Sequence, residues 1–89
     1  MMSHNGLTKL LEECGELSQI AAKKIAFPGT DEHPDKKGSM KKRLEEEIAD
    51  VIAACCFVAD ANGLDPEVII NRTERKINRF KKWHGDPNV

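Results

Sequence analysis

The sequence of 89 residues has little net charge, no tyrosine and no long apolar run. Its three cysteines, Cys14, Cys55 and Cys56, are odd in number and two of them are adjacent, which favours free thiols packed as small core residues in a reducing compartment. No apolar run reaches the roughly 18–20 residues of a membrane span, and the polar, acidic first residues do not resemble a signal peptide. We therefore expect a cytoplasmic protein with no membrane partner.

The net charge of −1 argues against a protein that binds nucleic acid by general electrostatic attraction, so no stable nucleic-acid partner is expected. Charged residues nevertheless make up 33% of the chain, so their local distribution carries the information. The length fits a single domain over residues 1–89. A domain this small is often marginally stable alone, and metal binding or oligomerisation commonly adds the missing stability.

Apolar residues recur at helical spacing in three segments, and neither strand alternation nor an internal repeat is visible. The segments cover approximately residues 3–25, 39–61 and 65–83. Two prolines and two glycines predict a loop over 27–38, and Ser39 and Asp65 are the predicted N-caps of the second and third helices. The sequence therefore predicts an all-α fold, a short helical hairpin followed by a third helix.

The predicted helices differ in how their apolar residues are arranged. The stripe of the first helix comprises Leu7, Leu10, Leu11, Cys14, Leu17, Ala21 and Ile25. In the second helix, eleven of the twelve residues from Ile48 to Ala59 are apolar, and Asp50 is the exception. A helix that is apolar all round is normally buried all round, and two other short helices cannot surround it. We therefore predict a homo-oligomer, a dimer or tetramer, assembled as a helical bundle.

Acidic residues cluster in "EECGE" at residues 12–16 and in "EEEIAD" at residues 45–50. Residues three apart are neighbours on a helix, so Glu13 pairs with Glu16 and Glu47 pairs with Asp50. Asp50 interrupts the apolar run, and an ionised carboxylate is costly to bury without a positive partner. In an antiparallel hairpin the pairs would converge on Mg²⁺, Mn²⁺ or Ca²⁺, which prefer oxygen ligands. A solvated acidic surface explains the same spacing, so spacing alone leaves both interpretations open.

The two acidic motifs resemble the E-E-x-x-E … E-x-x-D signature of the all-α nucleoside triphosphate pyrophosphatases, the MazG-like superfamily. The segments "LTKLLEECGELSQIAAKK" and "RLEEEIADVIAACCFVADANGLD" are similar to the family's two metal-binding helices, and "RKINRFKKW" resembles its basic closing segment. The resemblance extends over residues 7–83. It implies Mg²⁺-dependent hydrolysis, with Mn²⁺ as a second candidate, of a nucleoside or deoxynucleoside triphosphate to the monophosphate and pyrophosphate.

The resemblance also implies roles for individual residues. The positions that match the four metal ligands are Glu13, Glu16, Glu47 and Asp50. Glu12 matches the leading acid, which is a further ligand, a group that supports the ligands, or the base that takes a proton from water, so Glu12 and Glu13 are the catalytic candidates. The candidates for binding the substrate are Lys23, Lys76, Asn78, Arg79 and Trp83.

Two other functions and the base preference stay open. A phosphoribosyl-ATP pyrophosphatase would share the fold and the metal site, and only substrate profiling separates the two enzymes. A non-catalytic helical module, binding nucleic acid or a protein through the third helix, would instead show salt-dependent binding without hydrolysis. Because tyrosine is absent and aromatics are few, only Phe27 and Trp83 are candidates for stacking on a base, and both also suit core or interface packing.

Overall fold

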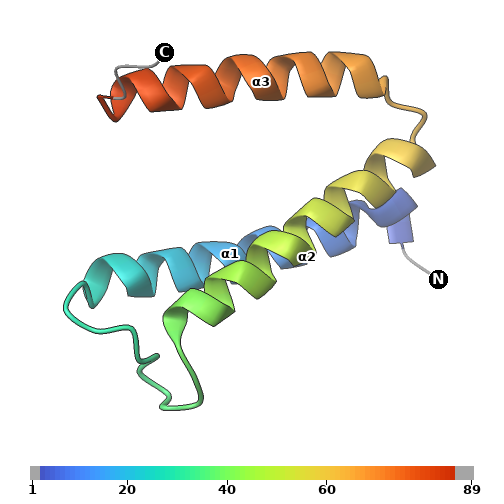
Figure 1. Ribbon diagram of the computed structural model, residues 1–89. Coiled ribbons are helices and arrows are strands. Elements are labelled where there is room, and N and C mark those ends of the chain that lie inside the picture. Colours follow the sequence, from blue (N-terminus) through green and yellow to red (C-terminus); the bar gives the residue numbers. More distant parts are fainter. Residues whose placement is uncertain (1–2, 86–89) are drawn as a thin grey trace.

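The computed structural model describes residues 3–85, and this range contains helices and no strand (Figure 1). The elements in chain order are the short 3₁₀ helix η1 (Ser3–Gly6), α1 (Leu7–Ala26), α2 (Met40–Ala61) and α3 (Pro66–Trp83). The prediction of an all-α fold with three helices is confirmed. None of the described helices combines the length and the hydropathy needed to cross a membrane.

Side-chain caps fix the starts of α2 and α3. The Ser39 hydroxyl accepts a hydrogen bond from the backbone N–H of Lys42 at 3.0 Å. The Asp65 carboxylate accepts one from the N–H of Glu67 at 2.9 Å, and Pro66 occupies the first helical position. Each cap satisfies one of the backbone N–H groups that a helix leaves without an internal partner. Both predicted N-caps are confirmed.

Gly6 determines where α1 begins and where it meets α2. Its φ of +88° lies in the left-handed region, so the α-helix starts at Leu7 rather than at residue 3 as expected. A Cβ atom on Gly6 would lie 2.6 Å from Cδ1 of Phe57, and the Asn62 amide donates to the Asn5 carbonyl at 3.2 Å. The first turn of α1 therefore contacts the last turns of α2, and the two helices form an antiparallel hairpin.

We expect Gly6→Ala to destabilise the protein by more than about 2 kcal/mol, because it adds left-handed backbone strain to a steric clash. Gly15 is the matched control, since a Cβ there would meet no atom within 4 Å. Gly15→Ala should stabilise helix α1 by roughly 0.5–1 kcal/mol. Urea denaturation followed by circular dichroism measures both. Equal stability of the two variants would contradict the close contact between Gly6 and α2.

The buried core of the hairpin is small and differs from the predicted stripe of α1. The buried apolar residues are Ile20, Met40, Ala54 and Val58. Ile20 was not in the predicted stripe. Leu11 and Ile25 belonged to that stripe, but they are 75% and 80% exposed. The prediction was right for Leu10, Leu17 and Ala21, which are half-buried, and wrong for the rest of the stripe. The inward face of α1 runs through Glu13 and Ile20, and an acidic residue on that face hides it from an apolar pattern.

The cysteines also differ from the prediction. Cys14, Cys55 and Cys56 are free thiols, as expected, but all three are exposed in the chain rather than packed in its core. The hairpin buries one narrow face of each helix, and these positions lie outside it.

Helix α3 stands apart from the hairpin within residues 3–85 (Figure 1). None of its residues is buried, although Ile69, Ile77 and Phe80 share one apolar side. Helix α2 likewise exposes Ile48 and Ile52. One chain therefore leaves apolar surface on both α2 and α3 uncovered.

Candidate metal centre

Four carboxylates converge where α1 and α2 face each other. Glu13 and Glu16 come from α1, and Glu47 and Asp50 come from α2. One oxygen atom from each residue lies within 4.8 Å of those of the other three. The geometry follows from the sequence, because an i,i+3 pair occupies one face of a helix and the antiparallel hairpin brings the two faces together. Glu13 is buried, Glu47 is half-buried, and the other two are exposed.

The carboxylates repel one another without a cation. The Oε2 atoms of Glu13 and Glu47 are buried and accept no hydrogen bond from any described residue. Burial, followed by the charges of Glu16 and Asp50, raises the pKa of Glu47 above its usual value. An unsatisfied buried acceptor costs about 1–3 kcal/mol, and more when it is charged. A divalent cation with oxygen ligands would satisfy both atoms, so these residues fit a metal centre.

Glu12 lies outside this group of four. Its Oε1 is 3.2 Å from Nζ of Lys9, which is also 3.4 Å from Oε1 of Glu13. The Glu12 side chain is half exposed, and its hydrogen bond to Lys9 is the main cause of the raised pKa of that lysine. Lys9 therefore neutralises the leading acid of the motif. Sequence analysis missed Lys9. Lys9 lies three residues before Glu12 and four before Glu13, and this spacing, which is typical of ion pairs on a helix, could have identified it.

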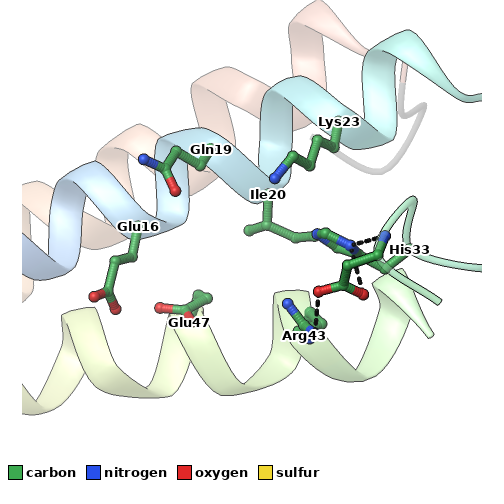
Figure 2. A pocket seen from close by; sticks show the side chains of 8 residues that line it. Glu16, Gln19, Ile20, Lys23, His33, Arg43 and Glu47 are labelled. Carbon is green, nitrogen blue, oxygen red and sulfur yellow. Dashed lines mark hydrogen bonds and ion pairs between the residues drawn. The ribbon is translucent and has the colours of Figure 1, made fainter. Parts of the chain in front are cut away.

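A cavity of about 350 Å³ lies beside the carboxylates, between α1, α2 and the loop that joins them (Figure 2). It is lined by Glu16, Gln19, Ile20, Lys23, His33, Asp35, Arg43 and Glu47. Glu16 and Glu47 belong to both the cavity and the carboxylate cluster, so the two are continuous. Of the predicted substrate-binding residues, Lys23 is the one that lines this cavity.

A hydrogen-bonded network closes the loop side of the cavity. His33 is 5% exposed, and its Nδ1 lies 2.9 Å from Oδ1 of Asp35. The other oxygen, Oδ2, accepts a hydrogen bond from the Arg43 guanidinium at 2.8 Å. The backbone N–H of Lys37, with smaller contributions from Arg43 and His33, lowers the pKa of Asp35 below its usual range. Asp35 is therefore an ionised link between the loop and the first turn of α2.

The loop is further tied to both helices by Asp31. Its carboxylate accepts a hydrogen bond from the Lys41 N–H at 3.0 Å and lies 3.8 Å from Nζ of Lys24. Its backbone carbonyl accepts from the N–H of Met40, whose side chain is fully buried. These contacts hold the loop residues in place at the open end of the hairpin.

The predicted substrate-binding residues of α3 do not reach the carboxylates of their own chain. Lys76, Asn78, Arg79 and Trp83 lie on the helix that stands apart from the hairpin. There, Nζ of Lys76 lies 5.8 Å from the centre of the Phe80 ring, and Lys76 and Arg79 border a small basic recess. Their role in substrate binding therefore stays a prediction.

The fold and the site together define an all-α protein with four converging carboxylates, which could hold a metal ion, between two antiparallel helices. A family model, the MazG nucleotide pyrophosphohydrolase domain, matches residues 2–84, and the chain belongs to this family. It is therefore a nucleotide pyrophosphohydrolase domain, a hydrolase that acts on acid anhydrides. No curated protein and no solved structure gave a significant match.

We expect Glu47→Gln to raise the melting temperature of the metal-free protein by a few degrees, because it removes one of four mutually repelling charges. The direction of the stability change follows from the raised pKa of Glu47. The folded chain holds the Glu47 proton more tightly than the unfolded chain, so the folded state loses stability as pH rises through that pKa. The gain should therefore be present at neutral pH and shrink in acid. Thermal melts with EDTA measure it.

The same variant should respond differently to metal. Millimolar Mg²⁺ should raise the melting temperature of the wild-type chain, since a ligand that binds the folded state stabilises it. Glu47→Gln should lose most of this rise. A wild-type protein that melts at the same temperature with Mg²⁺ and with EDTA would contradict a metal centre at these four residues.

Proposed function

We propose that this protein hydrolyses a nucleoside or deoxynucleoside triphosphate to the monophosphate and pyrophosphate, with Mg²⁺ as the metal and Mn²⁺ as a substitute. The observation that carries the proposal is the convergence of Glu13, Glu16, Glu47 and Asp50 within 4.8 Å in a MazG-family chain. The buried Oε2 atoms of Glu13 and Glu47, which have no hydrogen-bond partner among residues 3–85, support it further.

The four carboxylates would hold the cation, and Glu13, which is one of them, would together with Lys23 also act on water and substrate. When bound, a divalent cation neutralises phosphate oxygens and lowers the pKa of a bound water. Of the two catalytic candidates, Glu13 is better placed to accept a proton, because it belongs to the cluster and its Oε2 forms no hydrogen bond with a described residue, whereas Glu12 lies outside the cluster. Lys23 faces the adjoining cavity and would balance phosphate charge there.

We further propose that the protein is a homo-oligomer, a dimer or tetramer, in which α3 of one copy covers apolar surface on another. Ile69, Ile77 and Phe80 on α3 are 42–52% exposed, and Ile48 and Ile52 on α2 are 43% and 58% exposed. Burying such surface is the usual way in which small helical chains gain stability. This arrangement would also allow basic residues of α3 to reach the carboxylates of a neighbouring subunit.

The experiment that tests the function is pyrophosphate release from a panel of ribo- and deoxyribonucleoside triphosphates and phosphoribosyl-ATP. We expect release from at least one nucleoside triphosphate with Mg²⁺, none with EDTA, and recovery when Mg²⁺ is added in excess. Turnover of phosphoribosyl-ATP alone would assign the first alternative function. No turnover, together with salt-sensitive binding of nucleic acid, would assign the non-catalytic alternative.

A further inference from the structure

The positive charge of the chain is concentrated on α3. This helix carries six basic and two acidic residues, a net charge of +4, so the rest of the chain carries −5. The whole-chain value of −1 averages over this separation and therefore hides it. We propose that α3 binds the phosphodiester backbone of a nucleic-acid double helix, as a function that is additional to the proposed hydrolysis and does not rest on it.

Four of these cations form a stripe along one side of α3. We call this stripe the basic side; it consists of Arg72, Arg75, Arg79 and Lys82. Spacings of three and four residues place side chains on the same side of a helix. At a rise of 1.5 Å per residue the stripe is about 15 Å long, a length over which one strand of a duplex carries roughly four phosphates. The three arginines also line one recess of about 50 Å³, so they can act on a single anionic partner.

The cations of the basic side are not neutralised by other parts of the chain that the structure describes. All four residues are exposed, and none of them forms an ion pair with a residue in the range 3–85. By helical spacing, the acidic residues Glu67 and Glu74 lie on a different side of α3. Each arginine offers five N–H donors in a geometry that matches phosphate oxygens. The basic side is therefore ready to pair with phosphates.

The basic side is separate from the other functional surfaces of the chain. Helix α3 stands apart from the hairpin that carries the carboxylate cluster (Figure 1). The apolar side of α3, formed by Ile69, Ile77 and Phe80, is turned roughly 130° around the helix axis from the basic side. The proposed oligomer would therefore cover the apolar side and leave the basic side exposed.

The chemistry of the basic side favours a duplex over other anionic partners. A protein interface normally buries apolar anchor residues at its centre, and none of the four positions is apolar. Binding of a single strand draws on bases stacked against aromatic side chains, and none of the four is aromatic. A lipid surface would take up the apolar side of α3, which the proposed oligomer covers. The backbone of a duplex needs only regularly spaced cations, and DNA and RNA both supply it.

The test is fluorescence anisotropy of a labelled DNA duplex of mixed sequence, and of the corresponding RNA duplex, titrated with the full chain. The titrations contain EDTA and no nucleotide, so they are independent of hydrolysis. We expect the logarithm of the association constant to fall linearly with the logarithm of the salt concentration. The slope should be about −3.6 for each α3 that binds, since each of four phosphate contacts contributes about −0.9. Tighter binding of one duplex would identify DNA or RNA as the partner, and either result supports the proposal.

A triple variant tests whether the basic side makes these contacts. It combines Arg72→Gln, Arg75→Gln and Lys82→Gln, three cations to which no role in hydrolysis is assigned. We expect it to weaken duplex binding at least about a hundredfold at low salt and to reduce the slope to about −0.9, because one phosphate contact remains. Circular dichroism and sedimentation check that the variant is folded and has the mass of the wild type.

A matched triple variant controls for the loss of net charge. It combines Lys37→Gln, Lys41→Gln and Lys42→Gln, which remove the same charge from exposed positions outside α3. It should bind the duplex within about threefold of the wild type, because charges that do not contact the backbone are largely screened by salt.

The outcomes separate this inference from the proposed function. No duplex binding by the wild type, or equal weakening in the two triple variants, would overturn the inference even if nucleoside triphosphates are hydrolysed. Displacement of the duplex by poly-glutamate as readily as by unlabelled duplex would also overturn it, and would point to an acidic protein partner. Binding that weakens as expected, in a protein that releases no pyrophosphate from any nucleoside triphosphate, would support the inference and contradict the proposed function.

Discussion

Asp50→Asn is expected to lower the rate of Mg²⁺-dependent pyrophosphate release by at least about a hundredfold. Loss of a group that merely supports a metal ligand typically costs 10–100-fold in affinity or activity, and Asp50 is proposed as a ligand itself. An amide keeps the size of the side chain but removes the negative charge that holds the cation. Because Asp50 is exposed in the hairpin, the variant should fold and melt like the wild type or slightly higher.

Asp60→Asn is the matched control for that experiment. Asp60 is an exposed carboxylate on the same helix, and it lies outside the group of four. It should retain full turnover, while Asp50→Asn should also lose the rise in melting temperature that Mg²⁺ gives. Full activity of Asp50→Asn would remove Asp50 from the metal centre, and equal losses in both variants would indicate a general charge effect on substrate attraction.

The acidic pairs show what helical spacing alone can predict. The i,i+3 separations of Glu13 with Glu16, and of Glu47 with Asp50, place each pair on one helix face without further information. Their convergence also needed an antiparallel hairpin, which the loop over residues 27–38 predicted. Glu12 could not be placed in this way, because its direction depends on the competing ion pair with Lys9.

The cavity residues His33, Asp35 and Arg43 could not be predicted by the same reasoning. Their contacts join a loop to the start of a helix through hydrogen bonds that follow no repeating pattern. The histidine lies 5% exposed in a segment whose composition indicates only a loop. Sequence spacing therefore predicted the carboxylate cluster, and the structure was needed for the cavity beside it.

The core was predicted less well than the elements. The stripe expected on α1 included Leu11 and Ile25, whereas the hairpin buries Ile20 and Glu13. An apolar pattern cannot tell a face covered within the chain from one covered by another subunit. The exposed apolar positions of α2 and α3 are the ones for which the oligomer is proposed.

Ile77→Asp is expected to convert the protein to monomers at micromolar concentration. Ile77 lies with Ile69 and Phe80 on the apolar side of α3, so in the proposed oligomer a carboxylate there would be buried without a partner. Such burial costs several kcal/mol, and each 1.4 kcal/mol weakens association tenfold, so a loss of about a thousandfold or more is expected. Sedimentation equilibrium measures it directly.

Asn71→Asp is the control, because this substitution introduces the same charge. By helical spacing, Asn71 lies on the side of α3 opposite Ile69 and Phe80. It should sediment like the wild type.

All four carboxylates come from one chain, so the monomers formed by Ile77→Asp should still gain thermal stability from Mg²⁺. Their turnover should fall if Lys76 and Arg79 act across the subunit boundary, and stay unchanged if they do not. A wild-type oligomer that persists in Ile77→Asp would show that the apolar side of α3 is not the contact between subunits.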